Sequence, residues 1–196
     1  MRQGNFIANA IFGILERQLQ LLPGTITSLH QLTDRASDFL RILRYRGFES
    51  GKPYSRLGLP AHRDAVSIAM LFTWLGGLQI LKPDTDAETE GEDGWRWVKP
   101  LPGYAIVNLG DAMQLLTNNV LKSGVHRVVK APGEQAIYDK YSVLVVSRPA
   151  DKTPMKAFKS PSIPNDAPEP ANAEIMTCEQ WGNDKVKAFV EVIIKG

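Results

Sequence analysis

The feature that most constrains this chain is the triplet His62-Arg63-Asp64, taken together with one downstream histidine, His126. On an extended segment, side chains two residues apart point the same way, because successive residues alternate between the two faces of a strand. An imidazole and a carboxylate with this spacing can bind one ion, and an imidazole from a distant strand would complete the set. Two histidines and one carboxylate leave the opposite coordination positions open. The pattern therefore favours a metal centre built on strands, although His-x-Asp alone also occurs by chance in surface turns.

The residues after the triplet narrow the range of protein families that fit it, because they form an ordered series of motifs. These are an apolar run over 65–74, then Gly76-Gly77-Leu78-Gln79-Ile80-Leu81, Trp95-Arg96-Trp97-Val98, Pro102-Gly103-Tyr104-Ala105-Ile106-Val107-Asn108-Leu109-Gly110-Asp111, Thr117-Asn118-Asn119, Lys122-Ser123 and His126-Arg127-Val128. The series resembles the C-terminal catalytic half of the Fe(II)/2-oxoglutarate dioxygenase family that includes isopenicillin N synthase. Fungal members associated with specialised metabolism are the most similar. The resemblance extends from about Leu43 to Pro149.

The resemblance implies both a ligand set and a cosubstrate. Fe(II) would be held by His62, Asp64 and His126, with 2-oxoglutarate and O2 at the open positions. Family members also carry an Asn-x-Tyr motif whose tyrosine contacts the oxoacid. Tyr45 matches that tyrosine, whereas Leu43 occupies the Asn position. Tyr45 is equally consistent with an ordinary strand residue that is half buried at a sheet face.

The chain departs from the family at the residues that bind the far carboxylate of 2-oxoglutarate. Where the family has Arg-x-Ser, this chain has Lys140-Tyr141-Ser142. A lysine ammonium keeps the charge but cannot form the rigid two-bond fork that a guanidinium offers a carboxylate. Lys140 and Ser142 are therefore candidate cosubstrate ligands with weakened affinity, and the alternative for Lys140 is a solvent-facing strand position.

The apolar periodicity predicts a mainly β fold with a helix at each end. From Asn5 to Leu22 the apolar residues recur every three or four positions, as in an amphipathic helix that packs on a sheet, and Pro23-Gly24 ends the pattern. Short strands with one brief helix at 110–116 favour an antiparallel jelly roll, the double-stranded β-helix of the resembled family. The expected strands are 39–45, 65–72, 78–81, 95–98, 104–109, 125–130 and 138–147.

We expect three parts: an N-terminal helical segment, 1–38; the jelly-roll core, 39–150; and a Pro-rich segment with a C-terminal helix, 151–196. The last part should cover the sheet without contributing to the chemistry.

Three finer expectations concern a loop over 47–60, where Gly and Pro are frequent, a capping role for Asp111, and a helix capped by Thr177. The residues expected to be mostly buried are Trp95, Trp97, Ile106, Val107, Val128, Val143 and Val145.

Composition and charge exclude several classes of partner. The formal net charge is only +2 and the basic residues form no stripe, so nucleic acid is not expected. No apolar run approaches the ~20 residues of a membrane span. Cys178 is the only cysteine, so an internal disulfide is impossible, and a reducing cytoplasm would suit ferrous iron. A small-molecule substrate is the expected partner.

The leading functional hypothesis is an Fe(II)- and 2-oxoglutarate-dependent oxygenase that hydroxylates or desaturates a small molecule. Lys140 motivates a rival, an oxoacid-independent Fe(II) oxidase of the isopenicillin N synthase type. A third possibility is a non-catalytic dioxygenase-like binding module, because family members usually carry a further N-terminal region and this chain begins beyond most of it. Sheet edges left unpaired by a short chain would also favour homo-oligomers.

Overall fold

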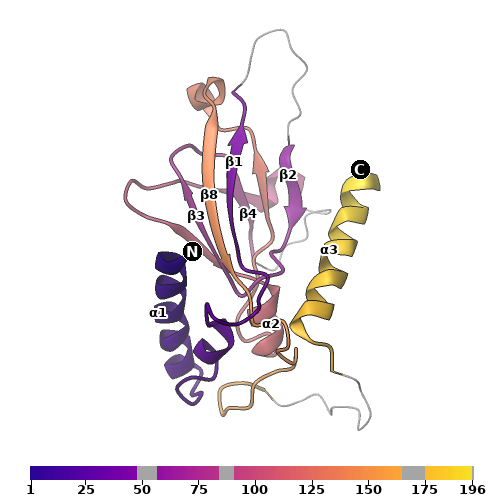
Figure 1. Ribbon diagram of the computed structural model, residues 1–196. Coiled ribbons are helices and arrows are strands. Elements are labelled where there is room, and N and C mark those ends of the chain that lie inside the picture. Colours follow the sequence, from indigo (N-terminus) through magenta and orange to yellow (C-terminus); the bar gives the residue numbers. More distant parts are fainter. Residues whose placement is uncertain (48–56, 84–90, 165–174, 196) are drawn as a thin grey trace.

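The computed structural model describes residues 1–47, 57–83, 91–164 and 175–195. In these residues eight strands form two four-stranded sheets, which we call the β8 sheet (β1-β8-β3-β6) and the β7 sheet (β2-β7-β4-β5) (Figure 1). The strands are β1 (Phe39–Tyr45), β2 (Leu57–His62), β3 (Ile68–Thr73), β4 (Leu78–Leu81), β5 (Trp95–Val98), β6 (Ile106–Leu109), β7 (His126–Val129) and β8 (Lys140–Ser147). Every pairing is antiparallel. The predicted mainly β jelly roll is confirmed.

Side chains of the β8 sheet alternate between an inner face, turned toward the β7 sheet, and an outer face. Tyr45 lies on the inner face, because a Cβ added to Gly58 of β2 would lie 2.9 Å from its ring. Lys140 is opposite Tyr45 in the β1–β8 register, and Ser142 follows two residues later on the same face. The inner face thus carries the polar candidates that the sequence singled out.

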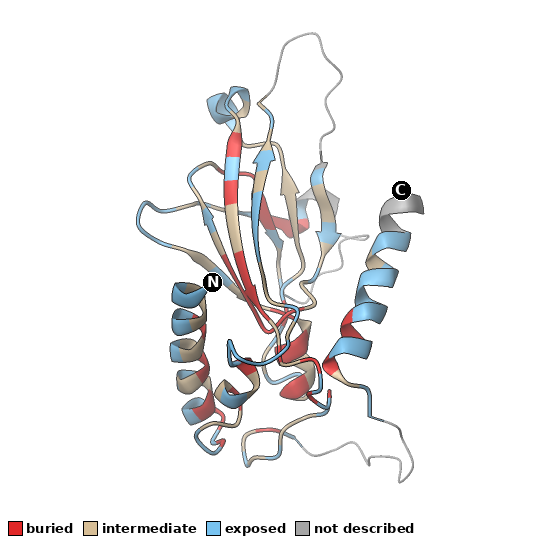
Figure 2. Ribbon diagram, viewed as in Figure 1, coloured by how far each residue is buried: buried red, intermediate tan, exposed pale blue. Residues whose placement is uncertain are grey.

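The helix α1 (Arg2–Gln18) packs on the outer face of the β8 sheet, as its periodicity predicts. Its Gly4 approaches so closely that a Cβ would lie 2.6 Å from the Val145 side chain. Ala8 and Phe12 follow at four-residue spacing and are fully buried. Figure 2 shows buried residues on one side of this helix and exposed residues on the other. Burial of this apolar stripe secures the N-terminal part to the sheet.

Glu16 anchors the chain where it leaves α1. Its Oε1 accepts the backbone N–H groups of Ile26 at 2.7 Å and Thr27 at 2.8 Å, and its Oε2 accepts that of Gly24 at 3.1 Å. Burial alone would raise the pKa of Glu16, but these hydrogen bonds outweigh it and lower the pKa. The turn into the next short helix is therefore stabilised by an ionised carboxylate.

The remaining helices are α2 (Asp111–Leu116), α3 (Cys178–Lys195) and the short 3-10 helices η1 (Thr27–His30), η2 (Gly91–Gly94) and η3 (Gly133–Ile137). At the start of α3, Thr177 Oγ1 accepts the N–H of Gln180 at 3.3 Å, and Gln180 Oε1 accepts the N–H of Thr177 at 2.8 Å. This capping box confirms the predicted cap. No helix among the described residues is both long enough and apolar enough to cross a bilayer.

The expected loop over 47–60 is wrong at its C-terminal end, because β2 occupies 57–62. Gly58 and Pro60 are tolerated there since β2 is an edge strand of the β7 sheet, where unpaired N–H positions can face solvent. The other part of the expected loop, 48–56, lies outside the described residues.

Two burial predictions are also wrong, because Trp97 and Val107 are 51% and 43% exposed. Both lie on edge strands, β5 and β6, where no further strand covers them. Trp95 shares a face of β5 with Trp97 but is buried, since the guanidinium of Arg127 lies 4.2 Å from its ring centroid. Val145 is buried as predicted, and the half-buried residues are Ile106, Val128 and Val143.

The capping role expected for Asp111 is likewise wrong. The N-cap of α2 is Gly110, and no side chain caps the helix. The Asp111 carboxylate instead accepts a hydrogen bond from Lys185 Nζ at 2.7 Å and so joins α2 to α3. The sequence could not reveal this partner because it lies far along the chain.

Replacing Glu16 by Gln should destabilise the protein by about 2 kcal/mol, because the amide brings donors to a buried site whose partners are themselves donors. A lowered pKa means that the stabilisation is present above the ordinary pKa of glutamate and is lost as the pH falls through the folded value. Urea unfolding should therefore show a deficit for Glu16→Gln at pH 7 that shrinks in acid. The exposed Glu134→Gln is the control, and equal urea midpoints for the two variants at pH 7 would contradict this account.

Candidate metal centre

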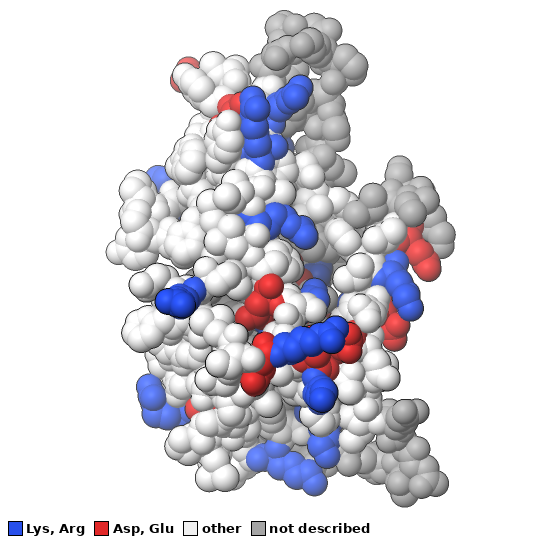
Figure 3. Space-filling model, in the orientation of Figure 1, with Lys and Arg blue, Asp and Glu red and all other residues white. Residues whose placement is uncertain are grey.

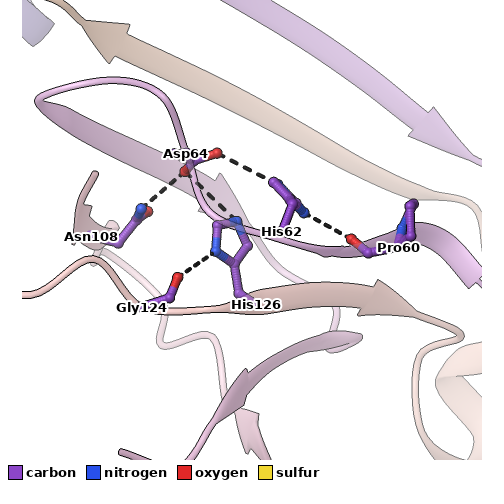
Figure 4. A network of polar contacts seen from close by, with 6 residues as sticks. All are labelled: Pro60, His62, Asp64, Asn108, Gly124 and His126. Atoms are coloured by element: carbon purple, nitrogen blue, oxygen red, sulfur yellow. Dashed lines mark hydrogen bonds and ion pairs between the residues drawn. The ribbon is translucent and has the colours of Figure 1, made fainter. Parts of the chain in front are cut away.

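The three predicted ligands converge at one end of the β7 sheet (Figure 4). His62 is the last residue of β2 and lies opposite His126, the first residue of β7, in the antiparallel pair. Asp64 lies just beyond β2. Its Oδ1 is 3.5 Å from His62 Nε2, and its Oδ2 is 3.7 Å from His126 Nε2. The side chains are only 11–19% exposed, so the cluster lies largely within the fold.

Both imidazoles are oriented by backbone carbonyls. His62 Nδ1 is 2.8 Å from the Pro60 carbonyl oxygen, and His126 Nδ1 is 3.2 Å from that of Gly124. A carbonyl can only accept, so each Nδ1 carries the proton and each Nε2 presents its lone pair to the centre. This is the tautomer that an Nε2 metal ligand requires.

The carboxylate of Asp64 is held from a second direction. Asn108 of β6 donates its Nδ2–H to Asp64 Oδ2 at 2.9 Å (Figure 4). The Asp64 carbonyl oxygen accepts the N–H of Asp111 at 2.8 Å, which ties this turn to the start of α2. Any side chain at Gly110 would collide with the carbonyl oxygens of Asp64 and Val66, so glycine is needed for this close approach.

The mutual contacts shift the pKa values of the three groups in different directions. Burial alone would raise the pKa of Asp64, but its contacts with His62, His126 and Asn108 lower it overall. Burial lowers the pKa of His126, and the neighbouring His62 charge adds to this effect. Burial also opposes protonation of His62, yet Asp64 and the Pro60 carbonyl raise its pKa. Asp64 is therefore a carboxylate and His126 a neutral imidazole, the forms that bind metal.

The geometry fits one divalent transition-metal ion. The three ligand atoms lie within 4.8 Å of one another. An ion bonded at about 2.1 Å to each would hold neighbouring ligands roughly 3–3.5 Å apart, close to the 3.5 and 3.7 Å that separate Asp64 from the two imidazoles. In the described part of the chain, no other cluster of three His, Cys, Asp or Glu ligands meets this test. His30, the remaining histidine, is buried elsewhere with its Nε2 2.8 Å from Ser67 Oγ.

The candidate cosubstrate residues lie on the inner face of the β8 sheet. A Cβ at Gly58 would contact both the Tyr45 ring and Val128, and Val128 shares a face of β7 with His126. Tyr45 and its neighbour Lys140 therefore face the same interior as the metal ligands. Ser142 is 2% exposed, and its hydroxyl donates to Thr73 Oγ1 at 3.4 Å.

Two residues at the centre were not singled out as ligands or supports from the sequence. The sequence could have indicated a role for Asn108, because it is the only polar residue in the strand Ile106–Leu109. Phe189 of α3 lies with its ring centroid 5.4 Å from that of His62. The sequence did not indicate this contact, since the C-terminal part was expected to be remote from the chemistry. Gln79 does not face the centre, because it accepts a hydrogen bond from Arg127 Nε at 2.7 Å on the opposite face of its sheet from His126.

An antiparallel β sandwich that brings two imidazoles and one carboxylate together defines a class, the non-haem Fe(II) oxygenases. Residues 37–149 match the family model of the 2OG-Fe(II) oxygenase superfamily. The chain belongs to this superfamily.

Known relatives agree with this assignment, and a solved structure agrees with the fold. The chain is 49% identical over 201 residues to a 2-oxoglutarate-dependent dioxygenase of Aspergillus fumigatus, a match that covers 96% of this chain and 52% of that protein. Codeine O-demethylase of Papaver somniferum is 32% identical over 63% of this chain and 31% of its own length. The crystal structure of a full-length Neurospora crassa protein in complex with alpha-KG superposes with a TM-score of 0.76 at 21% identity, covering 95% of this chain and 55% of that one. The chain thus spans about half the length of the first and third of these proteins.

Removing a ligand should abolish metal binding. Asp64→Ala and His126→Ala are each expected to eliminate stoichiometric Fe(II) binding in an anaerobic titration, because two ligands cannot complete the set. Asn108→Ala should keep the stoichiometry but weaken affinity by about 10- to 100-fold, since it only orients Asp64. Asp184→Ala, an exposed acid on α3, serves as the control. Full binding by Asp64→Ala would refute the ligand set.

Proposed function

We propose that this chain carries the catalytic centre of a non-haem Fe(II)- and 2-oxoglutarate-dependent oxygenase that hydroxylates or desaturates a small molecule. The observation that supports this most directly is the convergence of His62, Asp64 and His126 in a member of the 2OG-Fe(II) oxygenase superfamily. When bound, Fe(II) and 2-oxoglutarate together activate O2 for oxidation of the substrate.

The protein's own part is to hold the ligands and to shape a pocket around them. His62, Asp64 and His126 would hold the ion from one side and leave its other side for cosubstrate, O2 and substrate. Pro60 and Gly124 fix the imidazole orientations, and Asn108 keeps the carboxylate of Asp64 in place. Phe189 covers His62 from α3, so the C-terminal helix restricts the access of water on that side.

We also propose that Tyr45, Lys140 and Ser142 bind 2-oxoglutarate, with the Lys140 ammonium paired to its distal carboxylate. The support is their common inner face and their burial, since Lys140 and Ser142 are 5% and 2% exposed. A buried ammonium needs a counter-charge, and a dicarboxylate would supply one. The solvent-facing alternative for Lys140 is wrong, because the side chain is buried.

The proposal also includes a small-molecule partner and a cytoplasmic location. A small molecule is favoured over nucleic acid by the net charge of +2 and by the interspersed acidic and basic groups on the face seen in Figure 3. A cytoplasmic location is supported by the single, buried Cys178. A role in specialised metabolism is supported by fungal relatives such as the A. fumigatus protein. The division into 1–38, 39–150 and 151–196 remains our proposal for the organisation of the chain.

We further propose weak homodimer formation through the outer face of the β8 sheet beyond α1. There β1, β3, β6 and β8 present a continuous apolar surface; its exposed members are Leu40, Ile42, Phe72, Trp74, Val107 and Tyr141, at 38–69%. Together they expose roughly 500–600 Å². That is at the upper end for a monomer and below the ~800 Å² per partner of a standard interface. A second copy would therefore associate reversibly.

Cosubstrate use can be tested without knowing the substrate. Anaerobic addition of 2-oxoglutarate to the Fe(II) protein should produce the weak visible absorption of a chelated oxoacid. Lys140→Ala should weaken binding about 30-fold, equivalent to about 2 kcal/mol for an unpaired buried carboxylate. Lys140→Arg should preserve or tighten binding because it restores the two-bond fork. The exposed Lys159→Ala is the control.

Other outcomes of this experiment would favour the competing functions. A protein that binds Fe(II) and consumes O2 with a substrate, yet neither binds nor consumes the oxoacid, would be an oxidase of the isopenicillin N synthase type. Failure to bind Fe(II) at all would favour a non-catalytic module.

Self-association should appear as a mass that rises with concentration in light scattering after size exclusion. Ile42→Asp is expected to keep the protein monomeric, because it places a charge at the most exposed member of the apolar surface. Leu22→Asp, at a position 80% exposed beyond the end of α1, is the matched control. A wild-type protein that stays monomeric at high micromolar concentration would refute the interface.

A further inference from the structure

Lys140 is an unusual lysine, because only 5% of it is exposed and its neighbours among the described residues are not anions. Its Nζ lies 5.2 Å from the centroid of the Tyr45 ring. It also lies against the backbone of Gly77, where a Cβ would be 3.2 Å away. None of the ion pairs among the described residues involves Lys140. The ammonium is therefore desolvated, and the described part of the chain supplies no counter-charge to it.

The space beside Lys140 is suited to an anion. Lys140 lines a cavity of about 20 Å³, room for about one water-sized group, such as one end of a dicarboxylate. Each element around this cavity contributes a phenol, a cation or no charge: Tyr45 and Arg46 at the end of β1, Lys130 after β7, and Tyr138 before β8. Gly58 of β2 contributes no side chain. Among the described residues, the lining contains no acid.

We propose that Lys140 couples cosubstrate binding to its own protonation, so that this protein's affinity for 2-oxoglutarate falls as the pH rises above neutrality. The inference rests on the proposed function, because it assigns the distal carboxylate to Lys140. An arginine, which the family resemblance implies at this position, stays charged at every accessible pH and would show no such dependence. The coupling therefore comes from the lysine of this chain.

The expected size of the effect follows from linkage. Burial lowers the pKa of Lys140 to about 8, so the free protein loses the ammonium charge above that pH. A bound carboxylate favours the charged form and raises the pKa again, so binding takes up a proton. Between pH 7 and pH 9 the protonated fraction falls about tenfold, and the Kd should rise by about the same factor. A solvated lysine, with a pKa near 10.4, would leave the Kd unchanged over this range.

Anaerobic calorimetry on the Fe(II)-loaded protein tests the coupling without turnover. Titrations of 2-oxoglutarate at pH 7, 8 and 9, in two buffers of different ionisation enthalpy, yield both the Kd and the number of protons taken up. The wild type should show a tenfold rise in Kd and an uptake of about half a proton at pH 8. Lys140→Arg should bind with a flat profile and without that uptake.

A second ligand controls for protonation of the metal ligands. 2-Oxobutyrate presents the same chelating carboxylate and oxo group but lacks the distal carboxylate, so its Kd should not follow Lys140. Parallel pH profiles for wild type and Lys140→Arg with 2-oxoglutarate would overturn the coupling and leave the proposed function intact. Failure of both iron-loaded proteins to bind 2-oxoglutarate at any pH would overturn the cosubstrate assignment and the coupling together.

Discussion

The register of the β2–β7 pair places His62 directly opposite His126, and the rest of the centre depends on this pairing. Side chains alternate with period two along a strand, so a slip of one residue would turn one imidazole to the opposite face. The pairing is irregular between Leu57 and His62, which re-aims the end of β2. Asp64 can then reach both imidazoles, because Asn108 and the start of α2 hold it from the adjacent sheet.

The outer face of the β8 sheet contributes to the stability of the fold, and the inner face carries residues for the chemistry. The outer face packs against α1, and residues such as Val145 and Phe12 join α2 and α3 in one apolar core. The inner face carries Lys140 and Ser142, whose burial stabilises the fold little and leaves polar groups to be satisfied. Packing of α1 on part of the outer face supplies apolar burial that the polar end of the inner face lacks. The inner face is thereby available for ligands.

Several features were predictable because they depend on residues close together in sequence. The helix stripe of α1, the Thr177 cap and most strands follow from local periodicity and turn chemistry, and the motif series around His62 indicated the fold. The failures have physical causes at longer range. Trp97 and Trp95 have identical local patterns, yet only Trp95 has Arg127 over its ring. Asp111 was expected to cap α2, but its carboxylate pairs with Lys185 of α3.

The sequence by itself determined which groups are available for chemistry: two imidazoles, one carboxylate, and a lysine where the family resemblance implies an arginine. The tertiary structure alone decided their states and neighbours. Burial without a counter-ion, which lowers the pKa of Lys140, arises only when β1, β7 and the turn at Gly77 close around it. The contact of Phe189 with His62 likewise requires α3 to return to the sheet. Desolvation and long-range contacts depend on the whole packed chain, so they cannot be predicted from the local sequence pattern.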